Sequence, residues 1–411
     1  MAVLLIGTLD TKGVELQFVR DILLRAGLPC LVMDAGILQP PTFPPDIPRE
    51  KVFEAAGSSI EKVRSRADRG EAITLAAEGA AILAHRLHRE GTIQGILGMG
   101  GSAGTTIASA AMRALPFGVP KVMLSTLASG QVKPYVGVRD LTMMYSVVDL
   151  CGLNRISRTV LANAAQALVG MVQGRSQAVS PGSSTDRPLV TATMFGVTTP
   201  CVDRARQHVE SAGYEVLVFH ATGTGGQTME SFLEDGLISG VLDITTTELA
   251  DELVGGVLTA GPDRLTAAAQ KGVPQVIAPG ALDMVNFGPM DTVPERFRQR
   301  KLYKHNPTVT LMRTTPEEND RLGKEIAHKA SAARGPVAVF LPLRGVSALD
   351  REGQPFWWPE ANQALFQSLR NWMSPHVELV EMDVHINDEV FAVAMAEKLE
   401  KMMREASVRA M

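Results

Sequence analysis

The chain has 411 residues, of which 45% are hydrophobic, so it is long enough to bury two hydrophobic cores. Its formal net charge of −4 and its lack of a basic cluster interleaved with aromatic residues argue against nucleic acid as a partner. No apolar run reaches the ~18 residues of a membrane span, and Cys30, Cys151 and Cys201 form no CxxC pair, so we expect a cytoplasmic protein without a membrane segment or a zinc knuckle.

The N-terminal residues have the pattern of a βαβ unit. Residues 2–6 are predicted to form a buried parallel strand, residues 7–13 a polar turn, and the residues from about Val14 a helix that leads to a second strand over 31–33. Because α/β proteins place ligands at the carboxyl ends of parallel strands, this turn is a candidate ligand site.

Four residues of the turn are candidate cofactor ligands, namely Gly7, Thr8, Asp10 and Lys12. Asp10 is suited to a metal or ribose contact, and Lys12 is suited to a phosphate. The alternative for Lys12 is a solvated lysine, although a cation at the start of a helix opposes the helix dipole unless an anion is present.

Residues 36–90 depart from the βαβ pattern, and we refer to them as the excursion. They begin with the proline-rich stretch 39–48, which its prolines keep extended, and continue with helical stretches around 49–66 and 71–89. We expect the excursion to act as a lid or as a subunit contact.

A glycine-rich turn over residues 98–106 is the strongest functional signal in the chain. It holds four glycines in seven residues, follows the apolar run 93–97 and precedes a helical run of small residues over 107–112. Backbone N–H groups in such a turn, and at the N-terminus of the following helix, bind anions, most often phosphate. The alternative is a turn whose glycines only allow strand and helix to pack closely. The candidate cofactor ligands here are Gly98, Gly100, Gly101, Ser102, Gly104 and Thr105.

The glycine-rich turn matches known phosphate motifs only in part. It satisfies the loose dinucleotide pattern, but the next predicted strand, residues 121–124, is followed by Ser125 and Thr126 where that pattern needs an acid for the ribose. A nicotinamide cofactor is therefore disfavoured. No lysine follows the last glycine as in a P-loop, so a cation for the phosphates must come from elsewhere, and Lys12 is the candidate.

The second half of the chain repeats the first. Residues 174–188, rich in Ser, Gly and Pro, are predicted to link a nucleotide-binding domain over 1–180 to a second domain over 188–411. Beyond them, the residues around Ala212 correspond to those around Ala26 at a constant shift, and further matches join the later strands. The sequence therefore predicts an α/β protein with two Rossmann-like domains, mainly parallel sheets, an internal duplication and a ligand cleft between the domains.

Two matches fix the correspondence of the later strands. Gly240 corresponds to Gly95, and Gly272 corresponds to Gly118. In the second copy, Thr-Thr-Thr-Glu-Leu-Ala-Asp-Glu over residues 245–252 replaces the glycine-rich turn. The two domains are therefore not expected to bind the same ligand in the same way.

Polar side chains follow the predicted strands of the second domain. Arg313, Arg344 and His385 come after strands predicted over 308–312, 337–341 and 377–380, and strands of a parallel sheet share their carboxyl edge. Arginines so placed suit a carboxylate or phosphate, and His385 with Asp388 or Asp350 suits proton transfer, whereas structural ion pairs are the alternative. The catalytic candidates are His385, Asp388, Arg344 and Asp350, and the substrate-binding candidates are Glu248, Asp283, Arg313, Arg344 and Asn387.

A set of motifs taken together resembles a known family. The motifs are residues 7–12, the glycine-rich turn, 124–130, 145–149, 245–252, 342–347 and 385–388. They resemble, over essentially the whole chain, the family of the ATP-binding amino-terminal domain of the tomato mosaic virus resistance protein and its bacterial relatives. The resemblance implies two Rossmann-like domains, ATP with Mg²⁺ in the first, and a homodimer or higher homo-oligomer. It implies no particular reaction, and the metal ligands stay open.

Two functions remain in competition. One is an enzyme that binds ATP in the first domain and a small anionic metabolite, a carboxylate or sugar acid, in the second, with its chemistry in the cleft between them. The other is a nucleotide-responsive binding protein that acts through a partner. The many polar residues at the strand ends of the second domain favour the enzyme.

Overall fold

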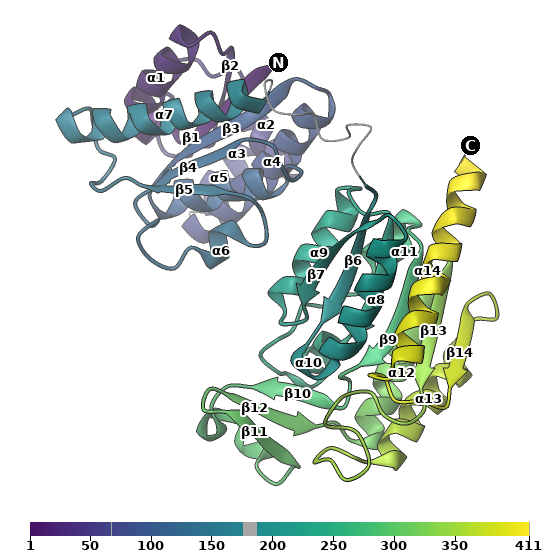
Figure 1. Ribbon diagram of the computed structural model, residues 1–411. Helices are drawn as coiled ribbons and strands as arrows, with labels where there is room; N and C mark the ends of the chain where they lie inside the picture. Colours follow the sequence, from purple (N-terminus) through teal and green to yellow (C-terminus); the bar gives the residue numbers. More distant parts are fainter. Residues whose placement is uncertain (67, 176–186, 411) are drawn as a thin grey trace. The chain divides into compact units, whose positions relative to one another are not determined.

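The computed structural model describes residues 1–66, 68–175 and 187–410. The chain divides into two compact units, Met1–Ser184 and Thr185–Met411 (Figure 1). Most of the predicted linker, residues 176–186, lies outside the described residues, so the predicted domain boundary and the predicted cleft between the domains stay predictions.

The first unit is built on a parallel five-stranded sheet in the order β2-β1-β3-β4-β5. The chain adds β2 to one side of β1 and β3 to the other, which creates a topological switch point between β1 and β3 at the carboxyl edge of the sheet. The strands are β1 (Ala2–Gly7), β2 (Cys30–Asp34), β3 (Ile93–Gly100), β4 (Lys121–Ser125) and β5 (Thr142–Tyr145).

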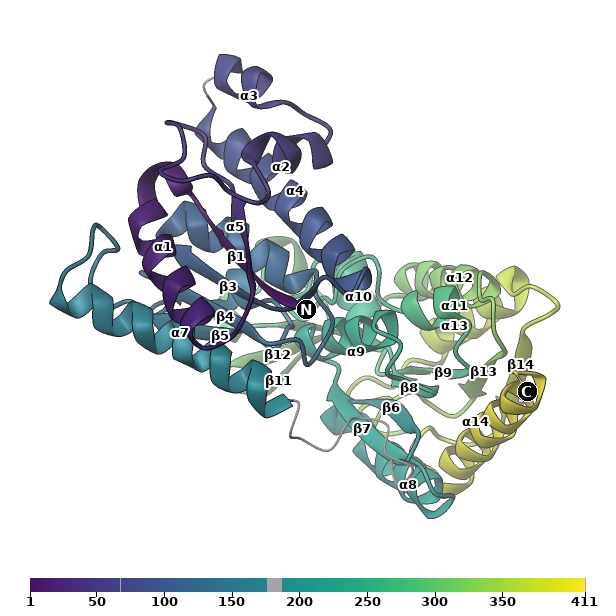
Figure 2. The ribbon, with the colours of Figure 1, turned by 90° about the horizontal axis from the view of Figure 1, so that it is seen from above.

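Helices cover both faces of this sheet. Alternate residues of each strand point to opposite faces, so Leu4 and Ile6 pack with α2, α3, α4 and α5, while Val3 and Leu5 pack with α1 and α7 (Figure 2). The helices are α1 (Leu9–Arg25), α2 (Arg49–Ala55), α3 (Ile60–Arg66), α4 (Arg69–Arg89), α5 (Ser102–Arg113), α6 (Lys133–Val136) and α7 (Arg155–Arg175).

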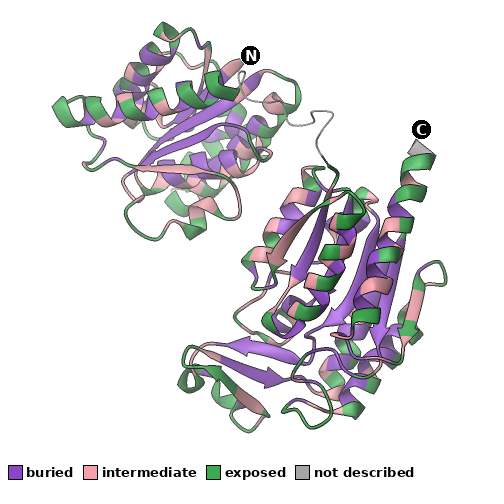
Figure 3. Ribbon diagram, in the orientation of Figure 1, coloured by how far each residue is buried: buried purple, intermediate pink, exposed green. Residues whose placement is uncertain are grey.

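The second unit has a parallel six-stranded sheet in the order β14-β13-β9-β8-β6-β7. Its first five strands therefore follow the same order as those of the first unit, with β14 added at one edge. The strands, most of which are buried (Figure 3), are β6 (Leu189–Met194), β7 (Glu215–His220), β8 (Gly240–Thr245), β9 (Gln275–Gly280), β13 (Val337–Pro342) and β14 (Glu378–Met382).

The pairing register repeats along with the strand order. Leu97 of β3 lies beside Val122 of β4, and Leu242, its equivalent in the sequence repeat, lies beside Val276 of β9. The predicted fold, two doubly wound α/β units related by internal duplication, is confirmed.

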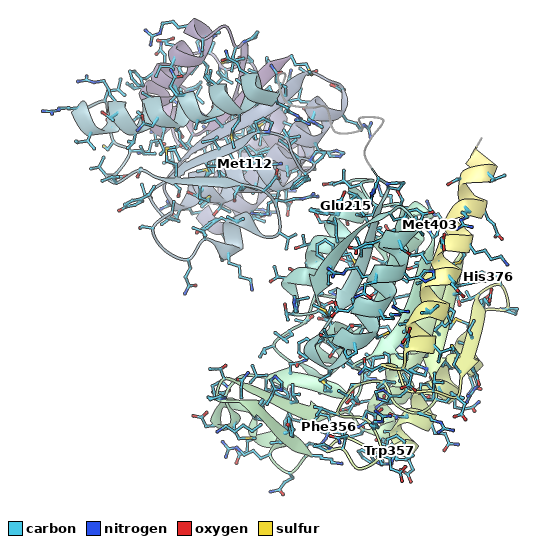
Figure 4. The ribbon with its side chains drawn as sticks, in the orientation of Figure 1. Met112, Glu215, Phe356, Trp357, His376 and Met403 are labelled. Carbon is cyan, nitrogen blue, oxygen red and sulfur yellow. The ribbon has the colours of Figure 1, made fainter. Side chains whose placement is uncertain are left out.

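Helices cover both faces of the second sheet as well. α8 and α14 pack on one face, where Met403 of α14 (labelled in Figure 4) lies over Gly240, and the other helices pack on the opposite face. The helices are α8 (Thr199–Ser211), α9 (Thr224–Glu234), α10 (Thr247–Val254), α11 (Ala267–Lys271), α12 (Pro316–Ser331), α13 (Pro359–Trp372) and α14 (Glu389–Ala410), with short 3₁₀ turns η1 (Gly196–Thr198), η2 (Met290–Thr292) and η3 (Glu295–Phe297).

A separate antiparallel sheet in the second unit corrects one prediction. Residues 308–312 were expected to form a strand of the main parallel sheet, but they belong to β12 (Val309–Arg313), which lies between β10 (Met284–Phe287) and β11 (Leu302–Asn306). β11 and β12 form a hairpin, and the side chain of Asn306 accepts hydrogen bonds from Thr308 in its turn. Arg313 therefore does not follow a strand of the parallel sheet.

The turn after β1 is also shorter than predicted. Residues 7–13 were expected to form a polar turn, but α1 already begins at Leu9 and is kinked at Lys12. The carboxylate of Asp34, at the end of β2, accepts a hydrogen bond from Leu9 N at 3.0 Å. A carboxylate at that position satisfies an otherwise unpaired N–H group of the first turn and allows the helix to begin early.

Candidate functional site

Close packing explains most of the glycines in the turn between β3 and α5. A Cβ atom on Gly98 would lie 2.3 Å from Cβ of Ala108, and one on Gly104 would lie 2.8 Å from the carbonyl oxygen of Met99. Gly100 has a φ of +154° and faces Gly104 across the turn. The packing alternative therefore accounts for Gly98, Gly100 and Gly104, which bring the N-terminus of α5 close to the end of β3.

Gly101 is different, because packing does not require it. It is the N-cap residue of α5, no side chain caps the helix, and a Cβ atom there would meet only Thr126 Oγ1 at 3.7 Å. The first N–H groups of a helix have no acceptor within the helix, so those of Ser102 and Ala103 are open to a ligand. Thr105 is not, because it is buried and its hydroxyl lies 2.7 Å from Ser125 Oγ.

The predicted ligands after β1 contact the protein itself. Gly7 is needed for packing against Leu16. Oδ2 of Asp10 accepts hydrogen bonds from Ile37 N at 3.0 Å and Leu38 N at 2.7 Å, which fastens the start of the excursion. Lys12 donates a hydrogen bond from Nζ to the carbonyl oxygen of Leu150.

A buried ion pair holds the excursion on the sheet. Arg49, the first residue of α2, donates from Nε to Asp34 Oδ2 at 2.7 Å, and its NH1 group donates to the carbonyl oxygen of Gln39 at 2.8 Å. Both charged side chains are almost completely buried. The residues at the carboxyl ends of β1 and β2 thus position the excursion over the edge of the sheet.

A cavity of about 580 Å³ lies at the switch point of the first unit. It brings together the turn after β1, the segment after β2, the N-terminal turn of α5 and the excursion. Its volume lies within the range of small-molecule sites. Its apolar wall includes Ile37, Leu38, Val63, Ile73 and Ile107.

The polar lining of the cavity comes from the turn after β1 and from the excursion. The turn contributes Thr8, Asp10 and Thr11, and the excursion contributes Arg64, Asp68 and Arg69. Ala103 is the residue of α5 that lies at the cavity next to the open N–H groups. Of the predicted cofactor ligands, Thr8 and Asp10 line the cavity. The others do not line it, namely Gly7, Lys12, Gly98, Gly100, Gly101, Ser102, Gly104 and Thr105.

In the second unit, the equivalent position is filled by the protein. Glu248 of α10 is the equivalent of Ala103 when Gly240 is aligned with Gly95. Its Oε1 accepts hydrogen bonds from the N–H groups of Gly223 at 2.7 Å and Gly226 at 3.1 Å. Burial raises the pKa of Glu248 against the opposing effect of Arg264.

Arg264 balances the buried charge of this position. Its Nε donates to Glu248 Oε2 at 2.7 Å, and its NH1 and NH2 groups donate to Asp243 at 2.6 and 2.5 Å. The Arg264 side chain has no exposed surface. Glu248, a predicted substrate ligand, is thus part of an internal ion cluster.

The partners of Arg313 among the described residues are internal as well. It is fully buried, and it donates to the carbonyl oxygen of Phe356 (Figure 4) at 2.7 Å, to Asn362 Oδ1 at 2.8 Å and to Asp350 Oδ1 at 3.3 Å. Asp283 lies in the same cluster, where its Oδ2 accepts a hydrogen bond from Ser347. These residues hold β12, the turn after β9 and the loop before α13 together.

Arg344 and His385 do not converge on an open site. Arg344 is exposed and forms two hydrogen bonds of 2.8 Å with Asp383. Nδ1 of His385 accepts a hydrogen bond from Asn387 N at 3.1 Å, so Nε2 carries the proton and donates to the carbonyl oxygen of Ser347 at 2.9 Å. Burial lowers the pKa of His385, which keeps the ring neutral.

The partners predicted for His385 contact other groups. Asp388 accepts a hydrogen bond from the backbone N–H of His385 rather than from its ring, and the side-chain amide of Asn387 donates to the carbonyl oxygen of Val197. The assignment of Arg313, Arg344 and His385 to one anion site stays a prediction, and the contacts observed here do not support it.

These features define a class: a protein of two doubly wound α/β units, of which the first has a ligand-sized cavity at its switch point. The chain belongs to the uncharacterised protein family UPF0261, because the model of the family's N-terminal domain matches residues 1–177 and that of its C-terminal domain matches residues 187–403. The predicted family is thereby confirmed.

Relatives of this chain occur in bacteria and in a plant. A UPF0261 protein of Clostridium tetani is 54% identical over 98% of both chains, and one of Rhizobium meliloti is 47% identical over 95% of this chain and 96% of its own. The ToMV resistance protein Tm-1 of Solanum lycopersicum is 44% identical over 85% of this chain, which corresponds to 47% of that protein.

Solved structures add little. A UDP-N-acetylglucosamine 2-epimerase from Rickettsia bellii shares 10% identity over 99% of this chain and 96% of its own, with a TM-score of 0.22, from which nothing follows. Among the described residues, no helix is both long and apolar enough to cross a membrane.

From the sequence, the excursion was expected to act as a lid or as a subunit contact, but none of its residues was named as a candidate ligand. Val63, Arg64, Arg69 and Ile73 line the cavity although each of them lies 29 or more positions away from α5 and from β1 in the sequence. The one available signal was that the first copy alone contains the excursion, at the edge of the sheet where ligands bind.

Proposed function

We propose that the first unit binds ATP with Mg²⁺ in the cavity at its switch point. The observation that carries the proposal is that Ala103, whose N–H group at the start of α5 has no acceptor within the helix, lines a cavity together with apolar side chains, the turn after β1 and residues of the excursion. The N–H groups suit the phosphates, and the apolar wall suits the base. The choice of ATP among nucleotides follows from the family resemblance.

The residues present are compatible with Mg²⁺ that arrives with the nucleotide. The described residues contain no group of three or more His, Cys, Asp or Glu side chains that would hold a metal ion alone. Mg²⁺ in nucleotide sites is held by substrate phosphates and one or two carboxylates. Asp10 meets that need, because its Oδ1 is buried, has no hydrogen-bond partner among the described residues and belongs to a side chain of the cavity wall.

Binding, rather than a reaction, is the function that we infer. The sequence-based case for an enzyme acting on an anionic metabolite depended on Arg313, Arg344 and His385, and each of these has partners within the protein. A nucleotide-responsive protein needs only the nucleotide site. Turnover of ATP in the presence of carboxylate or sugar-acid metabolites would instead support the enzyme function.

The proposal is tested by thermal unfolding with and without ATP and Mg²⁺. A ligand that binds only the native state raises the melting temperature. Gly101→Val is expected to keep the fold, since the added Cβ has space, but to remove the shift by blocking the backbone. Ala103→Glu is expected to remove it too, because the new carboxylate would lie where Glu248 lies in the second unit.

Thr106→Glu is the matched control for Ala103→Glu. It adds the same charge to the same helix at a residue that does not line the cavity, so the shift is expected to persist. If NADH or NADPH raises the melting temperature of the wild type and ATP does not, then the assignment of ATP as the ligand is wrong. If ATP raises the melting temperature of all variants equally, then the nucleotide does not bind at the start of α5.

A further inference from the structure

We propose that Arg64 and Arg69 of the excursion bind the phosphate groups of the nucleotide. The inference rests on the proposed function, and it names the source of the positive charge that the glycine-rich turn lacks. Lys12, the residue expected from the sequence to supply that charge, does not line the cavity and donates instead to the carbonyl oxygen of Leu150.

The two arginines are the cations of the cavity wall. Arg64 lies on α3, and its Nε donates to the carbonyl oxygen of Ile37 at 2.8 Å, which fixes the side chain at the cavity and leaves its two NH₂ groups available. Arg69 is the first residue of α4 and lines the same cavity. Neither forms an ion pair with a carboxylate among the described residues.

Nearby arginines outside the cavity do have such partners. Arg49 is paired with Asp34, and Arg66, on the same helix as Arg64, is paired with Glu71. The acid next to Arg69, Asp68, is committed as the N-cap of α4, where its Oδ1 accepts a hydrogen bond from Glu71 N at 3.0 Å. Unlike these neighbours, Arg64 and Arg69 form no ion pair among the described residues, although the exposed Glu61 of α3 interacts electrostatically with Arg64.

Asp10, which lines the cavity, has one carboxylate oxygen without a hydrogen-bond partner among the described residues. Its side chain is only 2% exposed, and Oδ2 is committed to the backbone of the excursion. Oδ1 has no partner in the described part of the chain, although a buried carboxylate oxygen without a hydrogen bond is unfavourable. A hydroxyl group of the ligand, or a cation bound with its phosphates, would satisfy it.

The second unit shows what such a site contains when it is complete. There, the carboxylate of Glu248 fills the equivalent space, and Arg264 neutralises it. In the first unit, Ala103 provides no carboxylate, yet two arginines remain beside the space. Asp10 and Asp68 also line the cavity, but neither forms an ion pair with Arg64 or Arg69, so the arginine forks are available to the oxygens of a phosphate group.

The test measures the binding of ATP and of adenosine to the full chain by calorimetry. The melting temperature with and without adenosine gives a second measure of adenosine binding. Arg64→Gln and Arg69→Gln are each expected to weaken ATP binding about tenfold or more, the usual effect of losing a hydrogen bond to a charged group. Adenosine binding should stay unchanged, because it has no phosphate. The affinity of the wild type for ATP should also fall with salt, and that of the double variant should fall less.

Two controls isolate the effect. Arg66→Gln removes the same charge from the same helix but from outside the cavity, and Lys12→Ala removes the cation that the sequence suggested, so both should bind ATP as the wild type does. The inference would be overturned if the double variant bound ATP as tightly as the wild type does, or if it lost as much affinity for adenosine as for ATP. Either result would leave the proposed nucleotide binding standing. A wild-type protein that binds neither compound would overturn the proposed function, and the inference with it.

Discussion

At the scale of single residues, Asp283 shows how far burial changes an ordinary carboxyl group. Its Oδ2 accepts a hydrogen bond from Ser347 Oγ at 2.8 Å, while its Oδ1 is buried and has no partner among the described residues. Burial, helped by the nearby charge of Asp350, raises the pKa of Asp283 to about 7. The folded protein therefore keeps a proton on this group that the unfolded chain loses.

This raised pKa predicts a pH dependence of stability. Between about pH 4 and pH 7 the folded state binds more protons at Asp283 than the unfolded state, so the free energy of unfolding should fall as the pH rises. Asp283→Asn mimics the protonated group and removes the effect. Relative to the wild type, the variant should gain about 1–4 kcal/mol between pH 4 and pH 8.

Urea unfolding across this pH range checks the prediction. Asp291→Asn is the control, since Asp291 is exposed and should behave as the wild type does. If Asp283→Asn changes stability by the same amount at every pH, then Asp283 titrates normally and its environment has been misread.

At the scale of secondary-structure elements, the excursion depends on the packing of α2 against α4. A Cβ atom on Gly79 of α4 would lie 1.8 Å from the carbonyl oxygen of Val52 in α2, so the glycine is what allows the two helices to touch. α4 also carries Ala72 and Ile73 of the cavity wall. The contact therefore helps to place that wall.

A pair of glycine-to-alanine variants tests this contact. Ala normally stabilises a helix relative to Gly by about 1 kcal/mol, and Gly170→Ala in α7, where the added Cβ meets nothing within 4 Å, should do so. Gly79→Ala should instead destabilise the protein by about 1–3 kcal/mol, because the backbone of α2 must move away. Urea unfolding gives both values, and stabilisation by Gly79→Ala would refute the packing described for α2 and α4.

The elements also show what the sequence could predict. Buried parallel strands such as β1 and β13 are continuous apolar runs, and the repeat revealed their equivalents, so the doubly wound fold was predictable. β12 is apolar as well, but an apolar run does not indicate which strand it pairs with. Only the Asn306 turn indicated a hairpin.

Only the part of the candidate site that neighbouring residues in the sequence form was predictable. The open N-terminus of α5 follows from a short motif. Arg64 and Arg69, however, are exposed helical residues that resemble solvated charges, and only the folded chain brings them to the cavity. His385 and Arg313 show the opposite error, because a polar residue near a strand end gives no sign of whether the protein already satisfies it.

At the scale of the whole molecule, two copies of one topology differ at the switch point of the sheet. Both units share the same strand order and register, yet the first has a cavity at the switch point and the second fills the equivalent place with Glu248 and Arg264. The first unit is therefore the one suited to a nucleotide. Dimerisation and a metabolite site in the second unit stay predictions.

A crystal structure of the protein with ATP and Mg²⁺ tests the central claim most directly. The account predicts the phosphates within hydrogen-bond distance of the N–H groups of Ser102 and Ala103, with Arg64 and Arg69 beside them and the base against Ile73 and Ile107. Nucleotide bound elsewhere in the first unit, or phosphates held by Arg344 or His385 in the second, would contradict it.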